Sequence, residues 1–428
     1  MTNTWKRHMA AALAAVLTAG ALGGCSGLSL PDDIHLPLLT GSESTPANES
    51  SAASAGQAVR SVTIQSEDGT DAGSAGAAET ASEGTGGFSY GTLTESQQET
   101  YQELYTGISQ HEETVTVNAG SDGDVQEAVT ALLDDHPEFF WLDGSATMVN
   151  YPLLGMCRLT FNFNIDASQI DATQAAIDAE AAKYLAQIPA GAGDYDKVKL
   201  AYEWLIENTE YVSDSAQNQN IQSVFLYHES VCAGYAKAMK YLLNQAGVTC
   251  AYIEGSVTDP GGGGTESHAW DLVAIDGTWT YVDPSWGDPT YGENASDSGR
   301  LPIIYDYLCL TTEEMTRSGH VPDPKFTNLP DCSSTTYDYY RLNGMFYETG
   351  DASALSQALW TAVENDAGNV YMKFASWDAY AEAVGLLLNG KSDLISDPLQ
   401  EKMKRDGNSS MNYYTSKSDT LWIIKIYW

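Results

Sequence analysis

The 428-residue sequence is poor in basic residues, with 20 Lys and Arg against 58 Asp and Glu. Its net charge of −38 repels phosphate backbones and anionic lipid headgroups, so the composition argues against nucleic acid as a partner. The sequence also lacks a CxxC pair and any Cys/His cluster with zinc spacing. We therefore expect neither a metal nor another cofactor. Beyond the N-terminus, no apolar run is long enough to cross a bilayer.

Residues 1–24 are predicted to be a lipoprotein signal peptide. Lys6 and Arg7 provide positive charge, and residues 9–20 form an apolar stretch too short to span a bilayer. The peptide ends in Leu-Gly-Gly-Cys, which resembles a bacterial lipobox and makes Cys25 the predicted lipid attachment site. An ordinary cleavage site or membrane anchor with an incidental cysteine is the alternative. The prediction is a chain held at the bacterial cell membrane by this anchor alone, facing outside the cytoplasm.

Composition divides the remaining chain into a linker and three α+β regions. Residues 25–90 are rich in Ser, Gly and Ala, and cannot bury enough apolar surface to offset the entropy of ordering. We predict a disordered linker there, followed by an N-terminal helical and α+β extension over 91–195. Residues 196–335 are the predicted core, and residues 336–428 a small α+β module that begins with a strand at 337–348.

Cys232 lies at the start of a predicted helix that closes at Gly247. The first N–H groups of a helix have no partner, and its dipole lowers the pKa of a thiol placed there. Ala233 and Gly234 are small and are expected to leave room for a substrate. Taken alone, a free cysteine is more often a small buried hydrophobe. With Cys25 assigned to lipid, five cysteines remain, and the pairing of the other four stays open.

A predicted β-hairpin supplies partners for the thiol. Asp276-Gly277 is a strong two-residue turn signal, and residues that face each other across it have numbers that sum to 553. His268 and Asp283 then share one face as diagonal neighbours, roughly 5–8 Å apart. A one-residue bulge would reverse this parity. An imidazole oriented by a carboxylate can take the proton of a thiol, so Cys232, His268 and Asp283 are the predicted catalytic residues.

Three further side chains have weaker cases. Trp270 is a candidate substrate-binding residue, although an aromatic residue beside a hairpin is more often part of the core. Gln222 could donate to an oxyanion, although the backbone N–H of Cys232 is the natural donor. His228 lies four residues before Cys232 and has no evident carboxylate partner.

The segments SVCAGYAKAMKYLLNQAGV and SHAWDLVAIDGTWTYVDPSW resemble the core of the transglutaminase-like superfamily. The resemblance implies a papain-like α+β fold, in which the helix bearing the cysteine packs on an antiparallel sheet. It also implies a Cys-His-Asp triad at Cys232, His268 and Asp283. One departure is Asp271, where Asn is more frequent after HAW, and which is expected to add negative charge near the site.

The same resemblance implies a cysteine protease or acyltransferase. Such an enzyme acts through a thioester on peptide or glutamine amide carbonyls, and for secreted bacterial members hydrolysis is favoured over crosslinking. The expected substrate is a protein or peptide, with cell-wall peptide included. The alternative is a non-catalytic binding or scaffold module at the cell surface that retains the fold.

Overall fold

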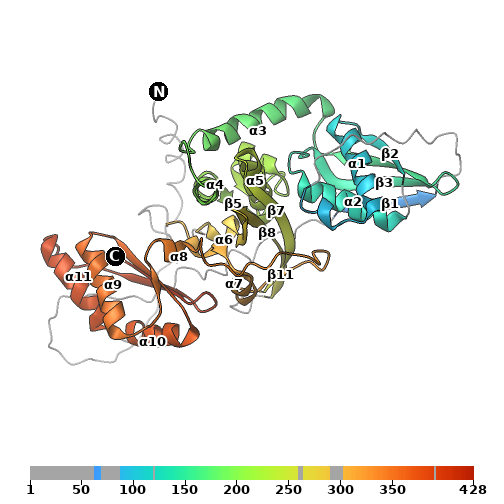
Figure 1. Ribbon diagram of the computed structural model, residues 1–428. Coiled ribbons are helices and arrows are strands. Elements are labelled where there is room, and N and C mark those ends of the chain that lie inside the picture. Colours follow the sequence, from blue (N-terminus) through green and yellow to red (C-terminus); the bar gives the residue numbers. More distant parts are fainter. Residues whose placement is uncertain (1–61, 69–86, 119–120, 259–263, 290–301, 390–391) are drawn as a thin grey trace, which may run out of the picture. The chain divides into compact units, whose positions relative to one another are not determined.

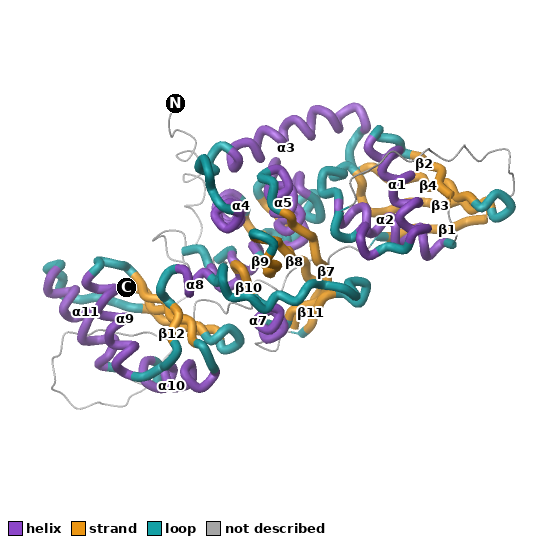
Figure 2. The backbone as a smooth tube through the Cα atoms, viewed as in Figure 1, coloured by secondary structure: helices purple, strands orange, loops and turns teal. Residues whose placement is uncertain are grey.

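Figures 1 and 2 show the computed structural model. It describes residues 62–68, 87–118, 121–258, 264–289, 302–389 and 392–428. The predicted signal peptide, Cys25 and most of the predicted linker lie outside these ranges. Within them, no helix combines the length and the apolar character that crossing a membrane requires. The fold is α+β, as predicted.

The N-terminal extension is built on a four-stranded sheet in the order β1-β3-β4-β2. Its elements are β1 (Thr63–Asp68), α1 (Glu95–Ser109), β2 (Thr114–Asn118), α2 (Asp122–Asp135), β3 (Leu142–Tyr151) and β4 (Met156–Phe163). Helix α1 begins with a capping box, in which the Thr94 hydroxyl accepts the Gln97 N–H and the Gln97 side chain accepts the Thr94 N–H. Buried apolar residues of both helices and of the sheet form one hydrophobic core.

The prediction of a disordered linker is wrong where strand β1 forms. This strand pairs in parallel with β3, and Ile64 packs against the hydrophobic core. Val62 and Ile64, two positions apart, are apolar and both pack against that core. At the end of the predicted linker, the backbone N–H groups of Ser89 and Tyr90 donate to the Asp135 carboxylate at 2.9 and 2.8 Å.

The central region is an antiparallel sheet in the order β10-β9-β8-β7-β11. Its elements are α3 (Ile170–Leu185), α4 (Asp194–Asn208), β5 (Glu210–Tyr211), β6 (Glu229–Ser230), α5 (Cys232–Gln245), β7 (Thr249–Thr258), β8 (Thr265–Ile275), β9 (Thr278–Val282), α6 (Pro284–Gly287), β10 (Leu308–Leu310), α7 (Thr312–Arg317) and β11 (His320–Pro322). Helix α5 packs against β7 and β8 (Figure 2). This helix-on-sheet arrangement confirms the predicted core.

The hairpin between β8 and β9 has the predicted register. Ile275 lies opposite Thr278, and Asp271 lies opposite Val282, so each pair of numbers sums to 553. Asp276 and Gly277 form the turn with φ of 48° and 79°. Positive φ at both positions is the requirement of a type I′ turn, which Asp-Gly satisfies at low cost.

The C-terminal module is a four-stranded sheet in the order β12-β13-β15-β14, with α9 and α11 side by side (Figure 1). Its elements are α8 (Tyr339–Leu342), β12 (Phe346–Tyr347), α9 (Ala352–Glu364), β13 (Asn369–Phe374), α10 (Trp377–Leu387), α11 (Asp393–Arg405), β14 (Tyr414–Ser418) and β15 (Ile423–Tyr427). Leucine, isoleucine and aromatic side chains of α9, α10, α11 and the sheet form a hydrophobic cluster within this module.

Two predictions for this module are corrected. The expected strand at 337–348 is mostly helix α8 and a turn, because the Asp338 carboxylate accepts the Arg341 N–H at 2.8 Å and caps a helical turn. Only β12 is extended. Helix α11 and strand β14 were not predicted, and Pro398 inside α11 interrupts the helical pattern in that segment.

Candidate active site

Cys232 is the first residue of α5, as the sequence predicts. The preceding residue, Val231, is extended and its side chain cannot accept a hydrogen bond, so the first turn has no side-chain cap. The Cys232 side chain is nearly buried, with 2% exposure, and packs with Tyr252 and Ala269. The thiol therefore lies at the positive end of a 14-residue helix, in an environment that contains little water.

Gly234 does not leave room for a substrate. A Cβ atom at this position would lie 2.0 Å from the Ser230 Oγ, 2.7 Å from the Ser223 Oγ and 3.1 Å from the Asn218 carbonyl oxygen. The two serine hydroxyls hydrogen-bond to each other at 2.6 Å. Glycine is required here because this buried pair occupies the space, so the expectation of an open approach to the thiol is wrong at this residue.

Asp283 is fixed by its place between β9 and α6. It is the N-cap of α6, and Pro284 at the first helical position favours the helical start. Its Oδ1 accepts the backbone N–H groups of Ser285 and Trp286 at 3.0 and 3.1 Å, and the Ser285 hydroxyl at 2.7 Å. Because all three donors bind Oδ1, Oδ2 is the oxygen that faces the hairpin.

The His268 imidazole donates from Nε2 to the Asp283 Oδ2 at 2.7 Å. Because Nε2 is bound, Nδ1 is the ring nitrogen that remains for the neighbouring Cys232 side chain. Burial alone would lower the pKa of His268, but the charges of Asp283 and Cys232, and hydrogen bonds to both, raise it to about 10. Burial would raise the pKa of Asp283, and the two histidines that contact it lower it instead.

The sequence did not predict one of those histidines. His320, at the start of β11, places its Nε2 3.3 Å from the Asp283 Oδ2. Its side chain is fully buried. A histidine between Gly319 and Val321 carries no local pattern that would place it on Asp283, because the contact depends on how β11 pairs with β7.

Tyr211 is a second residue that the sequence did not indicate. It follows α4 in strand β5, and β5 pairs with β6 directly before Cys232. Burial and the charge of Cys232 raise the pKa of the Tyr211 hydroxyl, and a hydrogen bond from the Cys232 backbone opposes that rise. The phenol therefore lies beside both the thiol and the first N–H of α5.

Burial disfavours the negative charge that the sequence position of Asp271 suggested. It is fully buried on β8, and the Cys250 thiol donates to its Oδ1 at 3.4 Å. Burial raises the pKa of Asp271 well above its usual value, and the nearby charge of Asp283 adds to the rise. Burial thus favours the protonated carboxyl, whose shape and polarity resemble those of the Asn expected at this position.

The remaining candidates do not take the roles predicted for them. Trp270 is fully buried, because the His320 ring packs edge-on against it at 5.2 Å, so it offers no surface to a substrate. The Gln222 amide donates to the Phe140 carbonyl and to the Asn164 Oδ1, both at 3.3 Å. Both of its protons are thus used away from Cys232.

His228 is also excluded as the base. It is exposed, and its Nδ1 lies 3.1 Å from the Asn208 carbonyl oxygen. The five cysteines that the structure describes are all free and buried: Cys157, Cys232, Cys250, Cys309 and Cys332.

His268, Asp283 and His320 also form the compact group of potential metal ligands found among the described residues, with ligand atoms within 4.8 Å of one another. Both Asp283 oxygens, however, already accept hydrogen bonds from named donors. The group is therefore better described as a hydrogen-bonded array around one carboxylate than as a metal site.

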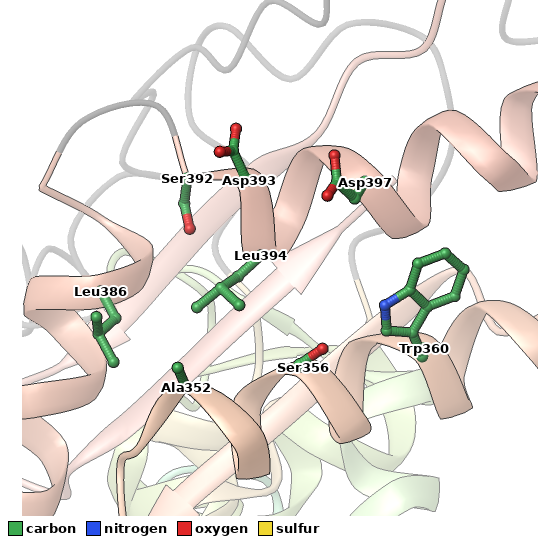
Figure 3. A pocket seen from close by; sticks show the side chains of 8 residues that line it. All are labelled: Ala352, Ser356, Trp360, Leu386, Ser392, Asp393, Leu394 and Asp397. Atoms are coloured by element: carbon green, nitrogen blue, oxygen red, sulfur yellow. The ribbon is translucent and has the colours of Figure 1, made fainter.

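A separate hollow of about 390 Å³ lies on the C-terminal module (Figure 3). Trp360 of α9 and Asp393 and Asp397 of α11 line it, together with small and aliphatic residues. It contains neither cysteine nor histidine. This hollow therefore lacks the thiol and the imidazole that the site around Cys232 combines.

Residues 182–284 match the family model described as the transglutaminase-like superfamily. The matched range contains Cys232, His268 and Asp283. Kyphoscoliosis peptidase of Mus musculus is 26% identical over 144 residues, which cover 31% of this chain and 21% of that protein. Kyphoscoliosis peptidase of Homo sapiens is 24% identical over 217 residues, covering 47% of this chain and 32% of that protein.

Among solved structures, the chain is similar to a TGase with a TM-score of 0.25 and 12% identity, covering 37% of this chain and 56% of that one. It is also similar to the periplasmic domain of TgpA from Pseudomonas aeruginosa, with a TM-score of 0.21 and 19% identity, covering 31% and 54%. The chain spans a fifth to a third of the length of the curated relatives that it matches.

These findings describe a mixed helix-and-sheet protein that contains a match to the transglutaminase-like superfamily. Residues 182–284 form a transglutaminase-like superfamily domain, which confirms the resemblance predicted from the two motifs. The match ends before His320 and before the C-terminal module. The domain limits predicted from the sequence stay predictions.

Proposed function

We propose that this protein is a cysteine enzyme that forms a thioester with the acyl group of a peptide or glutamine amide. Cys232 is the nucleophile, His268 transfers protons and Asp283 orients the imidazole. The observation that carries the proposal is the 2.7 Å bond between the His268 Nε2 and the Asp283 Oδ2, with Cys232 at the head of α5 on the other side of the ring.

The first half of the reaction transfers the acyl group to sulfur. The Cys232 Sγ attacks the carbonyl carbon and forms a C–S bond, and the charge that develops on the carbonyl oxygen needs hydrogen-bond donors. The Cys232 N–H and the Tyr211 hydroxyl lie side by side and are the proposed donors. His268 takes the proton of the Cys232 thiol and gives it to the amide nitrogen as the C–N bond breaks, which releases an amine or ammonia.

The second half regenerates the thiol. Water loses a proton to the His268 imidazole and attacks the thioester carbon, which releases the carboxylic acid as the C–S bond breaks. An amine in place of water would give a crosslink. We favour hydrolysis, with proteins, peptides or cell-wall peptides as substrates, and tethering to the bacterial cell membrane through Cys25.

Labelling with iodoacetamide tests the nucleophile. Cys232 and Cys157 have the same exposure, 2%, so they form a matched pair. Burial raises the pKa of the Cys157 thiol to about 12, and nearby carboxylates add to it. Peptide mapping should find Cys232 alkylated first, and His268→Ala should abolish this preference. Equal rates at both cysteines would contradict the proposal.

Mass spectrometry with casein and with peptidoglycan fragments tests the reaction. New termini indicate peptide hydrolysis, a mass increase of about 1 Da at glutamine indicates deamidation, and amine incorporation indicates transfer. Each product should be absent with Cys232→Ala. The matched control is Cys157→Ala, which should retain the activity. Turnover that survives Cys232→Ala would refute the role of this thiol.

A further inference from the structure

His320 is a second buried histidine on the Asp283 carboxylate, 37 positions further along the chain. It begins the edge strand β11, where it pairs with Val257 of the neighbouring strand β7. Its Nε2 lies 3.3 Å from the Asp283 Oδ2, and its Nδ1 lies 2.9 Å from the Ser318 Oγ. Both ring nitrogens therefore have polar partners, although the ring is fully buried.

Aromatic neighbours fix the plane of this ring. Trp270 and Trp286 pack edge-to-face against His320, with centroid distances of 5.2 and 4.6 Å. Tyr307 lies at 6.2 Å, and the His268 ring at 5.4 Å. A side chain held in this way cannot rotate away from Asp283 without displacing core residues.

The partners decide which ring nitrogen donates. The histidine contacts lower the pKa of Asp283, so this carboxylate is ionised and can only accept. The His320 Nε2 must therefore carry the hydrogen. Burial lowers the pKa of His320, against the effect of its bond to Asp283, and the ring is neutral. Its Nδ1 then accepts from the Ser318 hydroxyl, whose single proton is shared with the Met315 carbonyl oxygen at 2.9 Å.

We propose that His320 is a positioning residue of the Cys232–His268–Asp283 site, because its Nε2–H anchors the Asp283 oxygen that binds His268. This inference rests on the proposed function. It adds a residue from β11 that lies outside the matched range 182–284. The Oδ1 atom is held by α6 and the Oδ2 atom by two imidazoles, so the carboxylate has one orientation.

The second imidazole also sets the charge that His268 experiences. A donor on Oδ2 withdraws part of the negative charge available to the His268 Nε2–H. Without that donor, Asp283 attracts the imidazolium form of His268 more strongly. Loss of the His320 hydrogen bond should therefore raise the pKa of His268 and loosen its ring, two effects that a general packing defect would not combine.

A matched pair of variants isolates this hydrogen bond. In His320→Gln the amide nitrogen reaches the place of Nε2 and restores the donor, whereas in His320→Asn it reaches only the place of Nδ1. The side chains differ by one methylene. The test uses the full chain, with 13C-labelled histidine, and follows the His268 resonance by NMR between pH 6 and 11.

We expect His320→Asn to raise the pKa of His268 by roughly one unit, and His320→Gln to shift it by less than half as much. For peptide turnover, kcat should fall by about 10- to 100-fold in His320→Asn, with KM nearly unchanged. In His320→Gln, the decrease in log kcat should be at most about two thirds of the decrease in His320→Asn. Equal pKa values and rates in both variants and the wild type would overturn the proposal.

Ser318→Ala keeps the test decisive if His320→Asn does not fold. It removes the hydroxyl that orients the His320 Nδ1 and leaves the aromatic packing intact. The pKa of His268 should move in the same direction by a smaller amount, and an unchanged value would overturn the proposal.

The two readouts separate this inference from the proposed function. If the pKa of His268 shifts as expected but no substrate is turned over, the positioning role stands and the proposed function fails. If turnover depends on Cys232 while His320→Asn changes neither the pKa of His268 nor kcat, the enzyme stands and the positioning role fails.

Discussion

The His268 Nε2 and the Asp283 Oδ2 meet at 2.7 Å although 15 positions separate them in the chain. The hairpin turn at Asp276-Gly277 folds β9 back on β8. Asp283 is the N-cap of α6, and its carboxylate faces the sheet from this position. Two local signals, a hairpin turn and a helix N-cap, therefore produce a non-local pair. The pair is buried, so each partner changes the protonation of the other strongly.

Replacing Asp283 should reverse the pKa shift of His268. Burial lowers the pKa of this imidazole, and the charge of Asp283 is the largest effect that raises it to about 10. In Asp283→Ala we expect a pKa well below 10 and a loss of kcat on the order of 10³. NMR titration of His268 and the pH dependence of kcat measure the two effects.

Asp288→Ala is the control for this prediction. Asp288 is also buried, but its carboxylate accepts the Tyr235 hydroxyl at 2.7 Å, whereas His268 is bonded to Asp283. It should alter stability without the same displacement of the His268 titration. A shift of equal size in both variants would mean that loss of packing, and not the charge of Asp283, is responsible.

The same pair should stabilise the fold most at neutral and mildly acidic pH. The folded pKa of His268, about 10, exceeds its ordinary value of 6.5, so its contribution is complete below pH 6.5 and is lost as the pH rises toward 10. The pKa of Asp283 is lowered, so its contribution is present above pH 4 and is lost as the pH falls further.

Urea unfolding of wild type and His268→Gln across this range checks the sign. The difference in unfolding free energy should shrink between pH 6.5 and 10. His228→Gln supplies the comparison, because His228 is exposed and bonded to the Asn208 carbonyl. This variant gives the effect of removing a histidine that is not bonded to Asp283. If the difference in unfolding free energy between wild type and His268→Gln grew with pH, the prediction would be wrong.

The sequence predicted those parts of the site that depend on neighbouring residues. The start of α5 at Cys232, the two-residue turn at Asp276-Gly277 and the register of β8 and β9 follow from local patterns, and all three are confirmed. These patterns brought His268 and Asp283 to one face. His320 and Tyr211 could not be found in this way, since their contacts arise when β11 pairs with β7 and β5 pairs with β6.

Burial explains the other differences between sequence and structure. The sequence makes Trp270 a candidate for substrate contact because it shares a face of β8 with His268. The alternation along a strand predicts which face a residue lies on, but it does not predict how far that residue is from the surface, and Trp270 is fully buried. Asp338 could serve as a strand residue or a helix cap, and its bond to the Arg341 N–H makes it a cap. Strand β1 was not predicted, because the residues on both sides of it are rich in Ser, Gly and Ala.

Gly234 should be intolerant of even one methyl group. The Cβ of Gly234→Ala would meet the Ser230 Oγ at 2.0 Å and the Ser223 Oγ at 2.7 Å, inside a buried hydrogen-bonded pair. We expect a loss of about 1–3 kcal/mol in unfolding free energy, measured by urea denaturation. Because the clash lies in the first turn of α5, activity should fall as well.

Gly385→Ala is the matched control within the same chain. Gly385 is also inside a helix, α10, but a Cβ atom added there would have no neighbouring atom within 4 Å. Alanine there should raise the unfolding free energy by roughly 0.5–1 kcal/mol, because glycine loses more backbone entropy in a helix. Opposite signs at the two glycines would attribute the loss at Gly234 to the serine pair.

Replacing Asp271 with Asn should stabilise the protein. A buried carboxyl whose pKa is raised must keep its proton in the folded state, whereas the unfolded chain releases it above its ordinary pKa of 3.8. Folding therefore becomes less favourable as the pH rises above 3.8, and Asn has no such dependence. The gain of Asp271→Asn in unfolding free energy should be small near pH 4 and should grow toward pH 7.

Activity distinguishes a neutral Asp271 from a charged one. A neutral carboxyl does not alter the field at His268, so Asp271→Asn should change kcat by less than about threefold. The Cys250 thiol, which donates to the Asp271 Oδ1 at 3.4 Å, can donate equally to the Asn carbonyl oxygen. Cys250→Ala serves as the comparison, because it removes that donor and leaves the acid. A gain in stability that falls with pH, or a large shift in the pH profile of kcat, would show that Asp271 is ionised in the folded protein.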